Sequence, residues 1–242
     1  MDVGVDVADP QGVRGRAYDR QSMTTSLIAA AHGTRSAAGL ATTRRLIDLV
    51  RDLRPALAVD LCFLDVLEPS LRQRLARLDG AAVVVPVLLS AGYHVADDVP
   101  SIAGPHAEVR VARHLGPDRV ITQVLCERLI EAGGAGADHV ALVASPSRRA
   151  AAADDVAAAA ADLAEVLARP VHVLPLDDSL PSALAGMGGS VAVASYLLAE
   201  GAFHETLRAL ASSSVAAVAV AKPLGAHPAI AGLILERYDS AR

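Results

Sequence analysis

The sequence predicts an α/β protein made of two similar lobes, each with a parallel β-sheet covered by helices. Short apolar runs alternate with longer amphipathic segments along the chain, which is the pattern of repeated strand–helix units. Hydrophobic residues make up 52% of the 242 residues but aromatic residues only 2%, and a core of small aliphatic side chains is typical of parallel sheets buried on both faces. The alternation begins again halfway along the chain, which indicates an internal duplication.

The first half opens with an apolar run at Leu27, which is expected to form a buried strand ending at His32. The segment 38–54 follows as a covering helix, because Leu46 and Val50 fall on one face and charged residues lie largely on the other. The remaining strands of this half are expected near 58–64, 81–88 and 107–113, with helices near 69–78, 96–103 and 117–131.

A glycine-rich segment at 133–136 separates the two halves. Beyond it, strands are expected near 139–144, 171–175, 190–196 and 215–221, with helices between them. Local sequence recurs about 110 residues apart: 113–117 (RHLGP) resembles 222–226 (KPLGA), and His94 corresponds to His204. A near-constant offset across separate segments indicates a duplicated half, and two such lobes would face each other across a cleft.

Three regions are therefore expected: a disordered extension at 1–24, an N-terminal α/β lobe at 25–134 and a C-terminal α/β lobe at 137–242. The first 24 residues lack the apolar centre of a signal peptide. No apolar stretch reaches the length of about 18 residues that spans a membrane. The two cysteines, Cys62 and Cys126, form no CxxC pair and lie in apolar segments, which favours buried thiols in a reducing, cytoplasmic compartment.

The charge and composition favour a small-molecule partner. A net charge of -5 argues against an extended phosphate-binding surface, and the absence of tryptophan leaves little for stacking on bases. The chain contains neither a GxGxxG loop nor a P-loop lysine, so no nucleotide is expected. We expect no nucleic-acid or membrane partner, and either a monomer or a weak homo-oligomer.

Two histidines occupy matching positions in the first half. His32 stands at the end of the first strand, and His94 follows the apolar run 83–89, so both fall where open α/β sheets bind their ligands. Two neutral imidazoles at neighbouring strand ends make a natural site for a divalent metal ion. The second half keeps His204 but has Ser145 where His32 is expected, so a two-histidine site is predicted only in the first half.

Carboxylates are the next candidates. Asp65 and Glu68 lie at the carboxyl end of the second strand and can share the cleft rim with the histidines, although Glu68 is also suited to capping the next helix. Asp97 and Asp98 stand at the start of a predicted helix, where an N-cap role is favoured over metal ligation. A serine hydrolase is disfavoured because no G-x-S-x-G elbow occurs.

The segments that carry these residues resemble the CbiX/SirB family of class II tetrapyrrole chelatases. The similar motifs are 31–35 (AHGTR), 63–70 (FLDVLEPS) and 86–100 (PVLLSAGYHVADDVP). The third motif is long, so the resemblance is specific through the first half, and over the second half it rests mainly on the duplication.

The resemblance implies two flavodoxin-like lobes in a chelatase-like arrangement, and an ATP-independent lyase that inserts Fe(II) or Co(II), with Ni(II) as a further alternative, into sirohydrochlorin for sirohaem or cobalamin synthesis. The family's two functional histidines correspond to His32 and His94, which would bind the metal and accept the pyrrole protons. Family members often have glutamate where this chain has Asp65, so the reach of this third metal ligand is shorter by one methylene group.

A substrate with many carboxylates needs polar and cationic groups at the rim of the cleft. We expect this rim to include Arg35, Ser90, Gly92, Tyr93 and Arg113, which lie at or beyond predicted strand ends. Further cationic candidates at predicted strand ends of the second half are Arg148 and Lys222. Two alternatives stay open. A two-lobed protein that binds a small ligand or metal without catalysis would share the cleft, and a protohaem ferrochelatase would share the architecture but favour a lip rich in aromatic residues and methionine.

Overall fold

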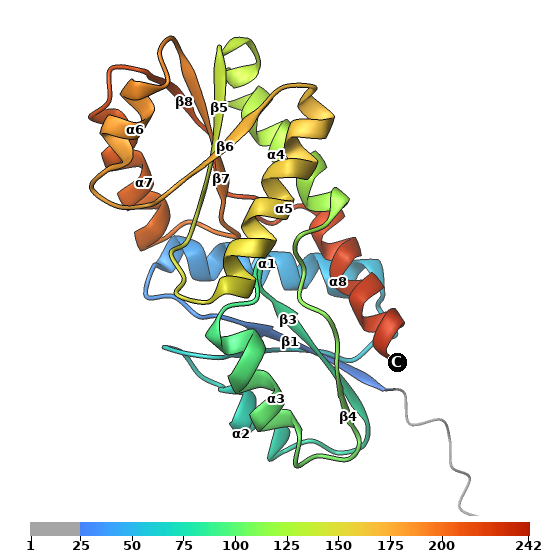
Figure 1. The fold of residues 1–242 in the computed structure, drawn as a ribbon. Coiled ribbons are helices and arrows are strands. Elements are labelled where there is room, and N and C mark those ends of the chain that lie inside the picture. The colour runs from blue at the N-terminus through green and yellow to red at the C-terminus, as the bar shows by residue number, and fades with distance from the viewer. Residues whose placement is uncertain (1–24) are drawn as a thin grey trace, which may run out of the picture.

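The computed structural model describes residues 25–242, so the extension expected at 1–24 lies outside the described residues. Eight parallel strands form two sheets (Figure 1). The strands are β1 (Ser26–Ala31), β2 (Val59–Phe63), β3 (Ala82–Val87), β4 (Val109–Val111), β5 (His139–Ala144), β6 (Val171–Leu174), β7 (Val191–Tyr196) and β8 (Ala217–Val220). The first sheet has the order β2-β1-β3-β4 and the second the order β6-β5-β7-β8, so the predicted α/β fold with two duplicated lobes is confirmed.

The central strands are built from the apolar runs of the sequence. Every residue of β3 and β7 is buried, and β1 is buried from its second residue to its end. In the first sheet Leu27 pairs with Val83 and Ala31 with Val87, and in the second His139 pairs with Val191. Because both sheets have the same order, the carboxyl ends of β1 and β3 correspond to those of β5 and β7.

Helices cover both faces of each sheet. They are α1 (Ala37–Leu53), α2 (Leu71–Leu75), α3 (Val99–Ala103), α4 (Arg119–Glu131), α5 (Ala150–Leu167), α6 (Leu180–Gly186), α7 (Ala202–Ser212) and α8 (Pro228–Ala241), with short η1 (His94–Asp98) and η2 (Gly134–Gly136) turns. One face of the first sheet carries α1 and α8, and the other carries α2 and α3. The second sheet carries α4 and α5 on one face, and α6 and α7 on the other.

The two halves of the chain exchange one helix each. Helix α4 follows β4 of the first sheet but packs against β7 of the second, whereas α8 ends the chain and packs against β3 and α1 (Figure 1). The expected boundary at 134–137 therefore marks where the second sheet begins but not how the helices are shared. We call the first sheet with α1, α2, α3 and α8 the first lobe, and the second sheet with α4 to α7 the second lobe.

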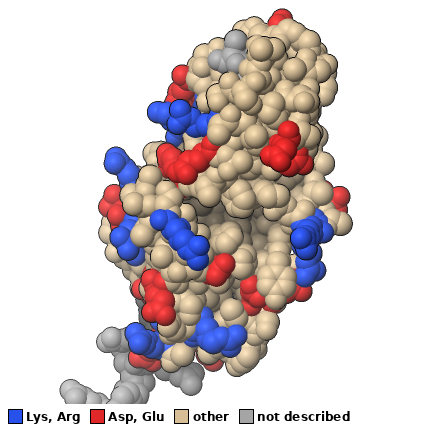
Figure 2. Space-filling model, turned by 90° about the vertical axis from the view of Figure 1, so that its left-hand side faces the viewer, with Lys and Arg blue, Asp and Glu red and all other residues tan. Residues whose placement is uncertain are grey.

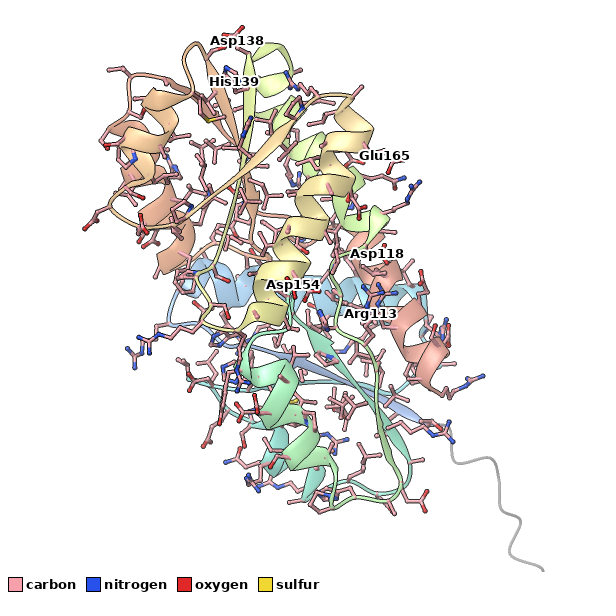
Figure 3. All side chains as sticks on the ribbon, in the orientation of Figure 1. Arg113, Asp118, Asp138, His139, Asp154 and Glu165 are labelled. Atoms are coloured by element: carbon pink, nitrogen blue, oxygen red, sulfur yellow. The ribbon has the colours of Figure 1, made fainter. Side chains whose placement is uncertain are left out.

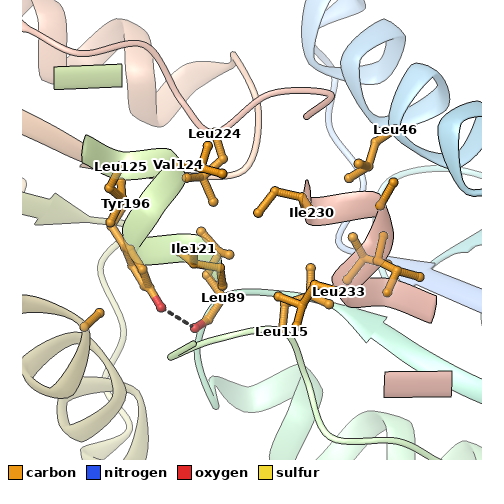
Figure 4. Close-up of a cluster of buried hydrophobic side chains, with 14 of the residues drawn as sticks. Leu46, Leu89, Leu115, Ile121, Val124, Leu125, Tyr196, Leu224, Ile230 and Leu233 are labelled. Carbon is orange, nitrogen blue, oxygen red and sulfur yellow. Dashed lines mark hydrogen bonds between the residues drawn. The ribbon is translucent and has the colours of Figure 1, made fainter. Parts of the chain in front are cut away.

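A continuous hydrophobic core joins the two lobes. Ile121 and Leu125 of α4 lie in the same buried cluster as Leu115, Leu224 and Ile230 (Figure 4). Burying apolar area contributes about 25 cal/mol per Å² to stability, so a shared core resists separation of the lobes. The relative position of the two lobes is thus set by packing and by the exchanged helices.

Two further expectations concern the chain as a whole. Within 25–242 the longest helices are too short or too polar to cross a bilayer. Cys62 is buried in the first sheet, where burial raises the pKa of its thiol to about 12, and Cys126 is half-buried. Both cysteines are free, as the sequence indicated.

Candidate metal centre

Three side chains that can bind a metal ion come together at the carboxyl ends of β1, β2 and β3. They are His32, Asp65 and His94, and one ligand atom from each lies within 4.8 Å of the other two. The two imidazole rings are 4.7 Å apart between centroids and are inclined by 65°. His32 and Asp65 are exposed and His94 is half-buried. Two nitrogens and one oxygen therefore face one small volume that solvent can reach.

His32 and Asp65 are held together by backbone pairing that continues past the ends of β1 and β2. The Asp65 N–H donates to the His32 carbonyl over 2.9 Å, and the Leu64 N–H donates to the Ala31 carbonyl over 2.8 Å. Gly33 then turns the chain with a φ of 98°, and a Cβ at this position would lie 2.1 Å from the Asp65 carbonyl oxygen. Only glycine combines the positive φ with such a close approach.

The carboxylate of Asp65 is oriented by its own turn. Its Oδ1 accepts the Val66 N–H over 2.8 Å, and its carbonyl accepts the Leu67 N–H over 2.7 Å. Val66 has a φ of 67°, a left-handed conformation that is rare for a β-branched residue. Strain of this kind persists only where the surrounding structure enforces it, and it is most common at functional sites.

His94 opens the π-helical turn η1 and is oriented by a carboxylate. Its Nδ1 lies 2.6 Å from Asp98 Oδ2. We assign the imidazole proton to Nδ1, because an ionised carboxylate can only accept a hydrogen bond. The Nε2 lone pair of His94 is then free for a metal ion or a proton. Carboxylates that hold metal-binding histidines in this way are a recurrent second layer of metal sites.

The N-cap role expected for Asp98 and Asp97 is wrong. Helix α3 begins at Val99, and its first turn receives no side-chain hydrogen bond from Asp98. The chain is already helical at Tyr93, and η1 runs directly into α3, so no open amides remain at position 98 to be capped. Both carboxylates are instead engaged by other side chains.

Asp97 forms an ion pair with a residue of the second lobe that the sequence did not single out. Arg149, in the loop between β5 and α5, donates from Nη2 to Asp97 Oδ2 over 2.5 Å. Its guanidinium also lies over the Tyr93 ring, 5.6 Å from the centroid. The Tyr93 ring is in turn 6.0 Å from the ring of His94. One side of the candidate centre is therefore built by both lobes.

The residues expected at the substrate rim take different positions. Arg35 lies exposed in the β1–α1 loop, close in sequence to His32. Ser90 and Gly92 lie in the loop after β3, where the Gly92 N–H donates to the Ser90 carbonyl, and Tyr93 is 56% exposed at its end.

Arg113 does not join this group. Its Nη2 donates to the Pro117 carbonyl over 2.9 Å. Figure 3 shows Arg113 near Asp118 and α8, on the flank away from the β1–α1 loop. Arg113 follows the edge strand β4, and the chain there turns towards α4 in the second lobe. Its position at a strand end was therefore a poor guide to its place in the cleft.

The second lobe also supports the loop that carries His94. The hydroxyl of buried Tyr196 donates to the Leu89 carbonyl over 3.0 Å (Figure 4). In α5, Asp155 Oδ2 accepts the Ala91 N–H over 2.6 Å and lies 2.9 Å from Nε2 of His114. These contacts join the loop to the second lobe at two points between the end of β3 and His94.

A hollow lies between the two lobes on the face to which the β1–α1 loop projects. Figure 2 shows this hollow with basic side chains (blue) on both sides and acidic side chains (red) beside them. The protein carries a net charge of -5, so cations at the hollow make its surroundings less repulsive to an anionic ligand than the net charge implies.

The corresponding position in the second lobe has no such centre. Ser145 follows β5 where His32 follows β1, and His204 is only 8% exposed inside the second lobe. Burial lowers the pKa of His204, which favours its neutral form. Across 25–242, the group of His32, Asp65 and His94 is the one set of three acidic, histidine or cysteine side chains placed to hold a metal ion.

Residues 26–132 match the model of the CbiX family. This segment contains His32, Asp65 and His94, so the resemblance predicted from the sequence is confirmed for the part of the chain that carries the candidate centre. A search of curated protein sequences found no match.

The fold is similar to those of three solved chelatase structures, each of which aligns with 90% of this chain. SirB from Bacillus subtilis subspecies spizizenii, in complex with cobalt, is 18% identical with a TM-score of 0.72 over 95% of its chain. SirB from Bacillus subtilis with Fe3+ is 19% identical with a TM-score of 0.73 over 95% of its chain. CbiX of denitrifying bacteria is 19% identical with a TM-score of 0.67 over 99% of its chain.

Proposed function

We propose that the protein is a sirohydrochlorin chelatase, an enzyme that inserts Fe(II) or Co(II) into sirohydrochlorin without ATP. One observation carries the proposal: His32, Asp65 and His94 gather their ligand atoms within 4.8 Å inside the segment that matches CbiX. The similar solved proteins support it, because SirB is described as a sirohydrochlorin chelatase with cobalt or iron bound, and CbiX as the terminal enzyme of siroheme biosynthesis.

The two imidazoles and the carboxylate suit a first-row divalent ion that is bound and then transferred to the substrate. Two neutral imidazoles and one carboxylate are ligands that Fe(II), Co(II) and Ni(II) all accept. Three protein ligands leave coordination positions open, as in catalytic metal sites, and incoming pyrrole nitrogens can take those positions. In this chemistry the metal ion is a substrate, so a solvent-exposed centre favours both its entry and its transfer.

Insertion releases two protons from the pyrrole nitrogens, and the histidines can receive them. As the metal ion moves from His94 to the macrocycle, the Nε2 lone pair becomes free and can accept a pyrrole proton. Asp98 at Nδ1 then stabilises the imidazolium that results. His32 offers a second acceptor 4.7 Å away between ring centroids. The same pair of residues thus serves metal delivery and deprotonation in turn.

The shorter side chain of Asp65 is compatible with this role. Although family members often have glutamate here, the β1–β2 extension brings the Asp65 backbone next to His32, so its carboxylate still lies within 4.8 Å of both histidines. At the rim we propose that Arg35, Ser90, Gly92 and Tyr93 contact the substrate.

The proposal is tested by following the absorption spectrum of sirohydrochlorin with the purified protein and Fe(II), Co(II) or Ni(II) in turn. We expect catalytic turnover with Fe(II) or Co(II), in the absence of ATP. A shift of the spectrum limited to one equivalent of protein would instead indicate a non-catalytic binding protein. The ranking of metals by rate then identifies which ion the centre transfers most readily.

A further inference from the structure

We propose that Arg149 of the second lobe binds a carboxylate of the tetrapyrrole, and that Asp97 occupies Arg149 until the substrate arrives. The inference rests on the proposed function, since it concerns the substrate of the same centre. It assigns a substrate contact to the half of the chain that lacks the metal ligands.

The loop that carries Arg149 is fitted against the first lobe. The Arg149 N–H donates to Ser147 Oγ over 3.2 Å, which turns the chain just before α5. Ser147 lies next to the His94 loop, since a Cβ on Gly92 would be 3.9 Å from its Oγ. The Arg149 guanidinium then lies over Tyr93, one ring away from His94. Its position is therefore defined by contacts with its own loop and with the first lobe.

The Arg149 guanidinium has more N–H donors than its hydrogen bond to Asp97 uses. Arginine carries five N–H donors in a planar fork that matches a carboxylate. In the structure one Nη of Arg149 bonds to Asp97, and the side chains of Arg149 and Asp97 are 45% and 43% exposed. An ion pair with this exposure is weakly held, because water competes for both charges. A substrate carboxylate can therefore replace Asp97 at little cost.

The distance from the metal ligands favours the edge of the substrate over its centre. A tetrapyrrole binds metal through nitrogens at the middle of a flat ring and carries its carboxylates around the periphery. The Tyr93 ring lies 6.0 Å from the His94 ring, and the Arg149 guanidinium lies 5.6 Å from the Tyr93 ring, so Arg149 is one aromatic ring removed from the histidines. With the ring centre at His32 and His94, we therefore expect Arg149 to meet a group on the periphery. The Asp97 carboxylate, which already accepts a hydrogen bond from Arg149, occupies the position that we expect a substrate carboxylate to take.

The neighbouring Arg148, which the sequence pattern favoured as the rim cation of this loop, provides a matched control. It lies exposed in the same loop and carries the same charge, but the ion pair with Asp97 and the stacking on Tyr93 belong to Arg149. Arg149→Gln and Arg148→Gln therefore change the net charge equally. A difference between the two variants therefore reports the contact made by the Arg149 guanidinium and not the general electrostatic effect of removing one positive charge.

The experiment measures the Kd of metal-free sirohydrochlorin from its absorption spectrum, together with KM and kcat for metallation. We expect Arg149→Gln to weaken binding and raise KM by about five- to tenfold, with kcat and Co(II) affinity changed less than about twofold. Arg148→Gln should change all of these by less than about twofold. Equal weakening by the two variants, or a loss confined to kcat, would overturn the assignment of Arg149.

The role of Asp97 is tested by a double-mutant cycle. Asp97→Asn should tighten binding of sirohydrochlorin about two- to threefold in the wild type and have no effect in the Arg149→Gln background. An equal effect in both backgrounds would overturn the exchange, because Asp97 would then act only by repelling the anion. If Arg149 governs binding but no metallated product forms, the proposed function fails while this inference stands. A wild type that does not bind sirohydrochlorin overturns both.

Discussion

The ends of β1 and β3 in the first lobe differ from the ends of β5 and β7 in the second, although the strand order is the same. The first position has His32 followed by Gly33, and the second has Ser145 followed by Pro146. Gly33 takes a φ of 98°, which proline cannot adopt because its ring holds φ near about −65°. The second lobe has therefore lost both the ligand and the turn that presents it.

The remaining histidines show the same contrast. His94 keeps a partly accessible ring beside Asp98, whereas His204 is buried inside the second lobe. The second lobe contributes in other ways, because Tyr196 and Asp155 hold the His94 loop. Duplication followed by divergence thus leaves one lobe with the candidate metal centre and the other as its support.

The largest effect is expected from the two corresponding histidines. His94→Ala should lower metallation turnover by at least about 100-fold, which is roughly 2.7 kcal/mol in the barrier, because it removes the residue that we propose as metal ligand and proton acceptor. His204→Ala should lower kcat less than about threefold while costing about 1–3 kcal/mol of stability as a buried truncation. Initial rates and thermal unfolding of both variants provide the comparison, and equal losses of turnover would make the second lobe catalytic.

The next effect concerns the turn that only the first lobe keeps. Gly33→Ala places a Cβ against the Asp65 carbonyl at a positive φ, so we expect a loss of about 2–4 kcal/mol in stability and more than about tenfold in Co(II) affinity. Gly232→Ala is the control, because a Cβ there meets nothing within 4 Å and helix propensity favours alanine by about 1 kcal/mol. Chemical denaturation and Co(II) titration measure both. Unchanged Co(II) affinity in Gly33→Ala would show that the close approach to Asp65 is dispensable.

A smaller effect is expected from the carboxylate behind His94. Asp98→Asn keeps the size of the side chain but removes the charge that orients the Nδ1 proton. We expect the affinity for Co(II) to fall about tenfold, in the range typical of groups that orient metal ligands. Asp98→Glu should recover part of the loss, which a purely structural defect would not allow. An Asp98→Asn protein with wild-type Co(II) affinity would leave His94 oriented by packing alone.

The smallest effect is a pH dependence of stability. The folded state lowers the pKa of His204, chiefly through burial, so below the unfolded value of about 6.5 the unfolded chain binds more protons than the folded one. Stability is then fully present above this value and is lost as the pH falls towards the folded pKa. We expect a flatter profile of unfolding free energy between pH 7 and 5 in His204→Gln. Parallel profiles would mean that other groups cause the acid loss.

The sequence predicted the parts of this site that depend on local patterns. Apolar runs and helical periodicity are local, so the strands, the duplication and the strand-end positions of His32 and His94 could be read directly. Asp65 followed from the same reasoning, because parallel strands end at one edge of a sheet. All three side chains meet in the structure.

The missed features depend on contacts between distant segments or on irregular geometry. His94 and Asp98 are four residues apart, a spacing that pairs side chains on a helix, but the sequence placed Asp98 at the start of the helix. The π-helical turn that begins already at His94 has no sequence signature of its own. Arg149 reaches Asp97 across the lobes, and Arg113 bonds to the Pro117 carbonyl in the segment that leads to α4. No local rule specifies such packing, although a basic residue in the loop corresponding to the His32 loop was a weak signal for Arg149.

Whether the chain has a single metal centre, located in the first lobe, is tested by the stoichiometry and location of Co(II) binding. We would titrate the protein with Co(II), follow the visible absorption of the bound ion, and compare the His32→Ala/His94→Ala and His204→Ala variants. We expect one Co(II) per chain in the wild type and in His204→Ala, and none when both His32 and His94 are replaced. Two ions per chain, or one ion that survives the loss of His32 and His94, would contradict a single metal centre in the first lobe.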